Sequence, residues 1–242
     1  MIMNKTTDYN KIFEKNLGKV FNFDCIKLME KMPKDSIDLL LTDIPYEKVN
    51  KKSNGLRNLN KGIANKKTFN LEMFLQCVDK VTKGGGYIFC GKEQVSKIFE
   101  FFNLKKYTTR LMIWEKKNPS PMNCQHVWMS GIECFIYFKK RGGTFNFFYK
   151  NSVVKFANGI SKIHPTQKPI ELFEYLIEAS SKKNDIVFDP CLGSGTTFFA
   201  AKNLNRRFIG SELNLNFCKH IETILSEYKS PFKDKNIKKT KC

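Results

Sequence analysis

The sequence lacks long apolar runs, paired cysteines and metal-ligand spacings. Because no run of about 18 apolar residues occurs, no membrane span is expected. None of the eight cysteines forms a Cys-x-x-Cys pair, and the three histidines lie at no metal-ligand spacing, so no metal site is expected. Residues 1–19 contain no apolar segment typical of a secretory signal. A reducing, cytoplasmic location is therefore expected.

Acidic residues are scarce. The 242-residue chain has 23 Asp and Glu against 42 Lys and Arg, which gives a formal net charge of +19. Such an excess favours nucleic-acid binding through counterion release, although a generic basic surface is the alternative. Clustering favours the first interpretation. Residues 47–68 hold seven basic side chains and one acid, and residues 139–168 hold seven and no acid.

The hydrophobic content of 41% suits a single α/β domain over residues 1–228, followed by a basic tail, 229–242, that is expected to be disordered. Apolar runs predict strands at 20–23, 37–41, 87–90, 109–114, 134–139, 186–188 and 208–211. Helical spacing predicts helices at 25–32, 71–81, 93–102, 169–180, 198–204 and 215–228. Three consecutive glycines, 84–86, are expected to separate a helix from the following strand.

One candidate site is Thr42-Asp43-Ile44-Pro45-Tyr46, which follows the apolar run 37–41. In open α/β sheets, ligands bind at the carboxyl ends of the strands. A carboxylate there can accept a hydrogen bond from an amine, and a tyrosine can stack on a planar ring. The stretch therefore fits the binding of a nucleobase by its amino group, while an ordinary proline turn is the alternative.

A second candidate is the glycine loop of residues 189–197, Asp-Pro-Cys-Leu-Gly-Ser-Gly-Thr-Thr, between a predicted strand and a predicted helix. Its glycines let a ligand approach the backbone, but the third glycine of a dinucleotide fingerprint is missing. Asp189 is placed to meet a cationic amine, and Glu212 ends the next strand, where an acid can bind ribose hydroxyls. These acids favour S-adenosyl-L-methionine over a dinucleotide. Cys191 is interpreted as a packing residue and not as a nucleophile.

These stretches resemble the β-class amino-group DNA methyltransferases. Residues 42–46 are similar to the family's Asp-Pro-Pro-Tyr motif, and residues 188–197 to its cofactor motif. The segments 114–121, 133–136 and 164–169 (His-Pro-Thr-Gln-Lys-Pro) also resemble family blocks. The resemblance spans residues 20–228, with the catalytic motif before the cofactor motif. Two departures are Ile44, where the family has proline, and Cys191, where it has phenylalanine.

The resemblance implies a Rossmann-like, circularly permuted methyltransferase sheet with a short target-recognition insert at 141–163. The permutation implies that strand 20–23 lies beside strand 208–211, which brings Asp24 to the cofactor; a helix cap is the alternative role for Asp24. The resemblance implies S-adenosyl-L-methionine as the cofactor. The residues implied to bind it are Asp24, Cys25, Thr166, Lys168, Asp189, Pro190, Gly193, Ser194, Gly195, Thr196 and Glu212.

The implied reaction is methylation of adenine N6 on a base flipped out of double-stranded DNA, with Asp43, Ile44, Pro45 and Tyr46 as catalytic residues. Cytosine-N4 methylation, RNA methylation, a non-catalytic DNA-binding relative and a dinucleotide oxidoreductase are the alternatives. Monomer and homodimer are both left open. DNA contacts are expected from the basic loop 47–68 and from the insert: Lys51, Lys52, Lys66, Lys67, Arg141, Phe147, Tyr149, Lys150 and Lys155.

Overall fold

The computed structural model describes residues 14–46, 69–119, 125–158 and 168–227. Eight strands form a single sheet in the order β1-β8-β7-β2-β3-β5-β4-β6. The strands are β1 (Val20–Phe21), β2 (Ile37–Asp43), β3 (Thr82–Phe89), β4 (Thr108–Lys116), β5 (Ile132–Lys139), β6 (Val153–Phe156), β7 (Ile186–Asp189) and β8 (Arg207–Ser211). The helices are α2 (Cys25–Lys31), α3 (Leu71–Val81), α4 (Val95–Leu104), α5 (Ile170–Ser180), α6 (Thr196–Asn203) and α7 (Leu215–Glu227).

The strand directions bring the two candidate motifs to one edge of the sheet. Neighbouring strands are parallel from β1 through β8, β7 and β2 to β3, whereas β5 runs antiparallel to both β3 and β4. We call the edge at which β2, β3, β7 and β8 end the carboxyl edge. Asp43 and Asp189 are the last residues of β2 and β7, and these two strands are direct neighbours. Parallel open sheets bind ligands at this edge.

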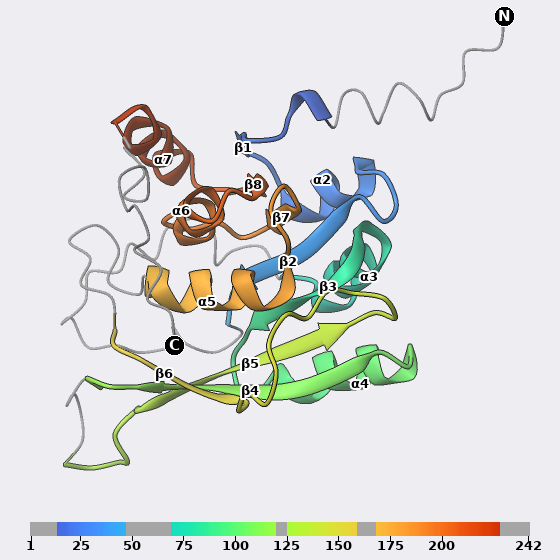
Figure 1. Ribbon diagram of the computed structural model, residues 1–242. Helices are drawn as coiled ribbons and strands as arrows, with labels where there is room; N and C mark the ends of the chain where they lie inside the picture. The colour runs from blue at the N-terminus through green and yellow to red at the C-terminus, as the bar shows by residue number, and fades with distance from the viewer. Residues whose placement is uncertain (1–13, 47–68, 120–124, 159–167, 228–242) are drawn as a thin grey trace, which may run out of the picture.

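The expected circular permutation is confirmed. Near the N-terminus, β1 lies beside β8, with Val20 paired to Gly210 and Phe21 to Ser211. Figure 1 shows the blue N-terminal strand next to the orange strands from the C-terminal third. The segment that follows β1 therefore lies next to the end of β8. The chain forms an open α/β sheet with the strand order that its motif order implied.

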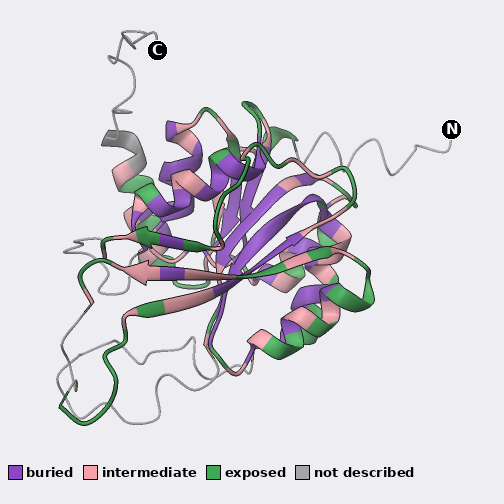
Figure 2. Cartoon of the chain, turned by 60° about the horizontal axis from the view of Figure 1, so that its bottom comes forward, coloured by how far each residue is buried: buried purple, intermediate pink, exposed green. Residues whose placement is uncertain are grey.

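Helices cover both faces of the sheet because successive strand residues point to opposite faces. Leu40 packs with α2, α3 and α4 on one face. Leu39 and Leu41 pack with α5, α6 and α7 on the other. The central strands are buried from both sides, which accounts for their continuous apolar sequences (Figure 2). No helix of the described ranges is long and apolar enough to cross a membrane.

The glycine triplet was interpreted wrongly as a break between a helix and a strand. Residues 84–86 lie inside β3, which begins at Thr82. A Cβ atom at Gly85 would lie 3.0 Å from the Cα of Lys139, and one at Gly86 would lie 2.6 Å from the Leu40 carbonyl oxygen. Glycine is needed here because the neighbouring strands approach the β3 backbone too closely for a side chain.

Two further boundaries differ from the sequence expectation. β2 continues through Thr42 to Asp43, because these residues pair with Ile88 and Phe89 of β3. The insert contains a strand that was not predicted, β6, which pairs with the end of β4 at the sheet's edge. The other predicted strands and helices occur with ends shifted by a few residues, as is usual for element boundaries.

Candidate active site

The two sequence motifs line one pocket at the carboxyl edge, with a volume of about 230 Å³. One wall comes from the end of β2 and another from the glycine loop between β7 and α6, with α5 and the end of β8 completing the site. Its lining residues are Asp43, Ile44, Pro45, Lys168, Phe173, Asp189, Cys191, Leu192, Gly193, Ser194, Thr196, Thr197 and Glu212.

The two carboxylate oxygens of Asp43 have different surroundings. Oδ2 accepts a hydrogen bond from the Lys168 ammonium at 2.6 Å. Oδ1 is buried and has no hydrogen-bond partner among the described residues. A buried carboxylate oxygen is costly unless a donor satisfies it. Asp43 therefore offers one free acceptor for a donor that enters the pocket.

Lys168 belongs to a buried charge network that the sequence did not reveal. Its ammonium, on a side chain only 7% exposed, lies 3.1 Å from Oε2 of Glu133, and Lys116 lies 2.7 Å from the other oxygen of Glu133. Burial by itself would lower the pKa of Lys168, but the carboxylates of Asp43 and Glu133 more than compensate and raise it. Lys168 thus remains positively charged at neutral pH, and its charge is held against Asp43.

A glutamine clamps the segment after β2. Gln94, which is fully buried, donates from Nε2 to the Pro45 carbonyl at 3.0 Å and accepts at Oε1 from the Gly91 backbone N–H at 2.9 Å. Ile44 donates its N–H to the carbonyl of Phe89, and its side chain is buried in the core. These contacts hold the backbone at Ile44 and at Pro45. The segment is therefore well supported although Ile44 replaces the proline of the family motif.

Tyr46 follows Pro45, and its ring is half-buried. The Lys168 ammonium lies 5.8 Å from the ring centroid. The hydroxyl is buried near Asp43, but the two side chains do not meet with hydrogen-bond geometry. Burial, together with the charges of Asp43 and Glu133, raises the pKa of Tyr46 far above its ordinary value. The phenol is therefore neutral.

The glycine loop has the backbone conformation that its sequence suggested. Gly193 and Gly195 have φ values of +55° and +86°, which side-chain-bearing residues rarely adopt. A Cβ at Gly193 would meet nothing within 4 Å, so open space lies beside the loop. At Gly195 it would lie 3.1 Å from Ile221 and 3.3 Å from Phe199. The loop is thus packed on one side and open on the other.

Asp189 anchors the start of this loop. It accepts hydrogen bonds from the Cys191 backbone N–H and from the Thr197 hydroxyl. Burial is the dominant influence and raises the pKa of Asp189 to about 7, although these hydrogen bonds oppose the shift. No described cation pairs with this carboxyl group. A positively charged ligand group would supply the missing countercharge.

Glu212 connects the loop to the end of β8. Oε2 accepts from the Gly193 backbone N–H and Oε1 from that of Asn214, both at 2.8 Å. Burial raises the pKa of this carboxyl group. Each oxygen keeps a second lone pair, so hydroxyl donors can still bind. Nearby, Ser211 donates its hydroxyl hydrogen to the Pro190 carbonyl.

The segment after β1 reaches this loop, as the permutation predicted. The Asn22 side-chain amide donates to the carbonyls of Glu212 and Leu213. Contact with the Cys25 thiol raises the pKa of Cys191, so these two cysteines are neighbours. Asp24 caps α2 by accepting from the Lys27 N–H at 3.1 Å. Its cap role is confirmed, and its contact with a cofactor stays a prediction.

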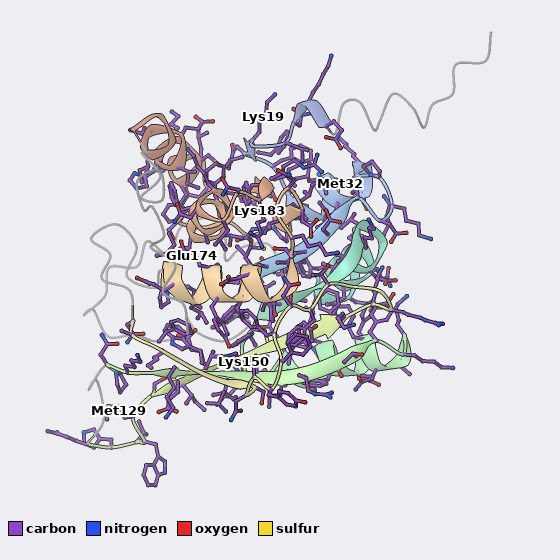
Figure 3. The ribbon with its side chains drawn as sticks, in the orientation of Figure 1. Lys19, Met32, Met129, Lys150, Glu174 and Lys183 are labelled. Carbon is purple, nitrogen blue, oxygen red and sulfur yellow. The ribbon has the colours of Figure 1, made fainter. Side chains whose placement is uncertain are left out.

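Five of the residues predicted to bind DNA are described, and they are spread over several elements of the structure. Arg141 follows β5 at the sheet edge opposite Asp43, and the Phe147 ring packs 5.0 Å from that of Tyr175 on α5. Tyr149 is fully exposed and Lys150 is exposed (Figure 3), whereas Lys155 lies on β6 and pairs with Glu115. The other four predicted DNA contacts, Lys51, Lys52, Lys66 and Lys67, lie outside the described residues. Thr166, which was predicted to bind the cofactor, also lies outside them.

Sequence reasoning missed Gln94 and Glu133 as site residues. Glu133 belongs to a segment noted only as a family block, and Gln94 carried no signal, because an isolated glutamine in a helical pattern is usually on the surface. Among the described residues, no three His, Cys, Asp or Glu side chains gather as a metal site would require.

Comparisons with known proteins match both the sequence and the fold. The profile of a DNA methylase family of the N6/N4 type matches residues 123–223. The chain is 30% identical over 221 residues to the type II methyltransferase M.HpaI of Haemophilus parainfluenzae, covering 80% of this chain and 69% of that protein. A solved complex of M1.HpyAVI with SAM superposes with a TM-score of 0.65 at 28% identity, over 85% of this chain and 98% of that one. The cytosine-N4-specific PvuII DNA methyltransferase gives a TM-score of 0.67 at 17% identity, covering 83% of each chain.

Proposed function

Because the chain belongs to the family of N6/N4 amino-group DNA methyltransferases, we propose that it transfers a methyl group from S-adenosyl-L-methionine to adenine N6 in double-stranded DNA. The observation that carries this proposal is the free, buried Oδ1 of Asp43, in a pocket shared with the glycine loop. An aspartate at this position favours adenine, because cytosine-N4 enzymes of this class more often have serine there.

The residues of the pocket fit the cofactor. Asp189 is a buried carboxyl group without a described countercharge, which suits the ammonium of the methionine part. The open space beside Gly193 admits a ligand against the backbone, and Glu212 retains lone pairs for ribose hydroxyls. Asp24 and Cys25, from the segment beside the loop, would border the adenine ring. When bound, S-adenosyl-L-methionine supplies an electrophilic methyl group.

Asp43 and its neighbours would act on the target amine. The amino group of a flipped adenine would donate one hydrogen to Asp43 Oδ1 and the other to the Ile44 carbonyl. These bonds direct the nitrogen lone pair away from the ring and towards the methyl carbon, so that positioning provides much of the rate. The N–C bond forms as the S–C bond breaks, its electron pair stays on sulfur, and the proton leaving nitrogen passes to Asp43. Tyr46, neutral at every physiological pH, would stack on the base.

Transfer of label to different nucleic acids tests the proposal. The protein is incubated with S-adenosyl-L-methionine carrying a tritiated methyl group and with plasmid DNA, denatured DNA or structured RNA. Label is expected in plasmid DNA at well above the rate for RNA. Preferential labelling of RNA, or no labelling of any nucleic acid, would contradict the proposed substrate. A thermal-shift comparison of the same cofactor with NAD separates the methyltransferase from a dinucleotide enzyme.

Replacing Lys168 separates two roles for this residue. The sequence suggested cofactor binding, but its ammonium contacts Asp43. Lys168→Met removes the cation shared by two buried carboxylates, and losing one partner of such a network costs about 3–5 kcal/mol. We expect kcat to fall at least about 100-fold, with the cofactor Kd within about threefold of wild type, and Lys168→Arg to restore part of kcat.

The matched control is Lys140→Met. Lys140 is also mostly buried and also lies between two carboxylates, Asp35 at 3.6 Å and Asp79 at 3.5 Å, but at the opposite end of the sheet. Its kcat should remain close to wild type even if the variant melts at a lower temperature. Single-turnover methyl transfer and calorimetric titration with the cofactor provide both readouts. A large rise in Kd with unchanged kcat in Lys168→Met would instead assign Lys168 to the cofactor.

A further inference from the structure

The loop between β4 and β5 presents an unusual apolar surface. Val127, Trp128 and Met129 are 64%, 98% and 48% exposed, so a whole indole ring is in solvent. We call residues 127–129 the hairpin tip. Figure 3 shows Met129 at the end of a projection away from the body of the protein. Exposed large apolar side chains in a group mark a surface that another molecule covers.

The hairpin tip lies on the active-site side of the molecule. In the sheet register, Asp43 pairs with Phe89, Phe89 with Phe135, and the antiparallel strand β5 begins three residues earlier at Ile132. The hairpin therefore leaves the sheet at the carboxyl edge. Its base contacts the site directly, since Glu133 lies 3.1 Å from the same lysine that binds Asp43. Trp128 is five residues from Glu133, a reach of roughly 17 Å for an extended chain.

Charge indicates what covers the hairpin tip. Between Glu115 and Glu133 the sequence contains no acid, two lysines and one histidine. The whole chain carries a net charge of +19, so a second copy facing this surface would be repelled. A polyanion with an apolar interior would be attracted, and duplex DNA, with phosphates outside and stacked bases inside, has this composition.

We propose that Trp128 inserts between base pairs of the bound duplex and stabilises the gap from which the target base is flipped. This rests on the proposed function, which requires a base outside the stack. Apolar side chains inserted at base steps unstack the bases, and an aromatic ring that stacks in the gap partly offsets the cost of unstacking. The indole supplies the stacking surface, and Val127 and Met129 supply apolar flanks. The flipped base leaves the gap that Trp128 fills, and its amino group then binds the free Oδ1 of Asp43.

Tryptophan fluorescence tests the insertion without relying on turnover. The chain has two tryptophans, Trp114 at 2% exposure and Trp128 at 98%. Acrylamide should quench the Trp128 emission, and the variant Trp128→Ala gives the baseline from Trp114. Duplex DNA is expected to shield Trp128 from acrylamide and to quench its emission by stacking. If saturating DNA leaves the accessibility of Trp128 to acrylamide unchanged, the proposal is overturned. Shielding of Trp128 that increases with protein concentration in the absence of DNA also overturns it, because a second copy would then cover the hairpin tip.

Methylation kinetics provide the second readout. The methylated site is first located on plasmid DNA and placed in a short duplex, and the same site is prepared with a mismatch opposite the target base. Trp128→Ala is expected to lower kcat/KM on the matched duplex about 10- to 100-fold and on the mismatched duplex less than about threefold, because a mismatched base flips more easily. The control is Leu104→Ala, a 77% exposed side chain at the end of α4.

The outcomes separate this inference from the proposed function. Wild-type turnover of the matched duplex by Trp128→Ala overturns the insertion while leaving the methyltransferase assignment intact. Failure of the wild-type protein to methylate any DNA overturns the proposed function. In that case the fluorescence measurement still decides whether Trp128 enters DNA. Equal losses on matched and mismatched duplexes would assign Trp128 to general DNA affinity and overturn a role in flipping.

Discussion

Asp43→Asn is expected to lower the rate of methyl transfer at least about 1,000-fold while the cofactor Kd stays within about threefold of wild type. The amide keeps the size of the carboxylate but presents only one acceptor oxygen and cannot take up the proton that the target nitrogen loses. It also places an NH₂ group beside the Lys168 ammonium or in the position of the free Oδ1. The first orientation sets two donors against each other and breaks the contact with Lys168, and the second presents a donor to the incoming amine.

Single-turnover transfer of label to DNA and calorimetric titration with S-adenosyl-L-methionine measure the two quantities separately. Asp35→Asn is the matched control, because Asp35 precedes the same strand at its other end. That variant should retain wild-type turnover. If Asp43→Asn methylates DNA within tenfold of wild type, or if its main defect is in cofactor affinity, Asp43 is not the residue that receives the amine.

Asp189→Asn is expected to weaken cofactor binding about 100-fold or more. The ammonium would lose a buried carboxylate partner, and losing one member of a buried ion pair typically costs about 3–5 kcal/mol. The same carboxylate gives the wild-type protein a definite pH response. Only the ionised form pairs with an ammonium. As the pH rises towards about 7, the pKa of Asp189, cofactor affinity should therefore increase by up to tenfold per pH unit, and at higher pH it should level off.

The stability of the cofactor-free protein should respond in the opposite sense. The folded-state pKa of Asp189 lies above its ordinary value of 3.8, so this group's contribution to stability is fully present below about pH 4 and is lost as the pH rises to about 7. Asparagine has no such loss. The melting temperature of Asp189→Asn relative to wild type should therefore be higher at pH 8 than at pH 5.

Asp185→Asn is the control for both measurements, because Asp185 immediately precedes the same strand, β7, and accepts a hydrogen bond from the Lys182 N–H. Its cofactor affinity should match wild type at each pH. Unaltered cofactor binding by Asp189→Asn between pH 6 and 8 would show that the ammonium is bound elsewhere.

The sequence predicted those parts of the site that depend on local spacing. Asp43 follows an apolar run, and Gly193 and Gly195 lie between a strand and a helix, so each motif could be placed on the fold directly. The neighbourhood of β1 and β8 followed from the motif order. The two motifs are carried by consecutive residues and do not require knowledge of distant contacts, whereas the β1–β8 pairing was implied by the family resemblance.

Contacts between distant segments could not be predicted in this way. Glu133 meets Lys168 because β5 begins at the carboxyl edge, and Gln94 reaches Pro45 because α4 starts beside the end of β2. The glycines of β3 were misjudged because their requirement comes from the backbones of Asp38, Leu40 and Phe138 on neighbouring strands. Trp128 was overlooked because its exposure depends on how the hairpin leaves the sheet.

Identification of the methylated nucleoside tests the central claim most directly. Plasmid DNA methylated with S-adenosyl-L-methionine carrying a trideuterated methyl group is digested to nucleosides and analysed by mass spectrometry, with Asp43→Asn in parallel. The account predicts deuterated N6-methyl-2′-deoxyadenosine from the wild-type protein and almost none from the variant. Deuterated N4-methyl-2′-deoxycytidine as the main product, or a methyl group on carbon 5 of cytosine, would contradict it.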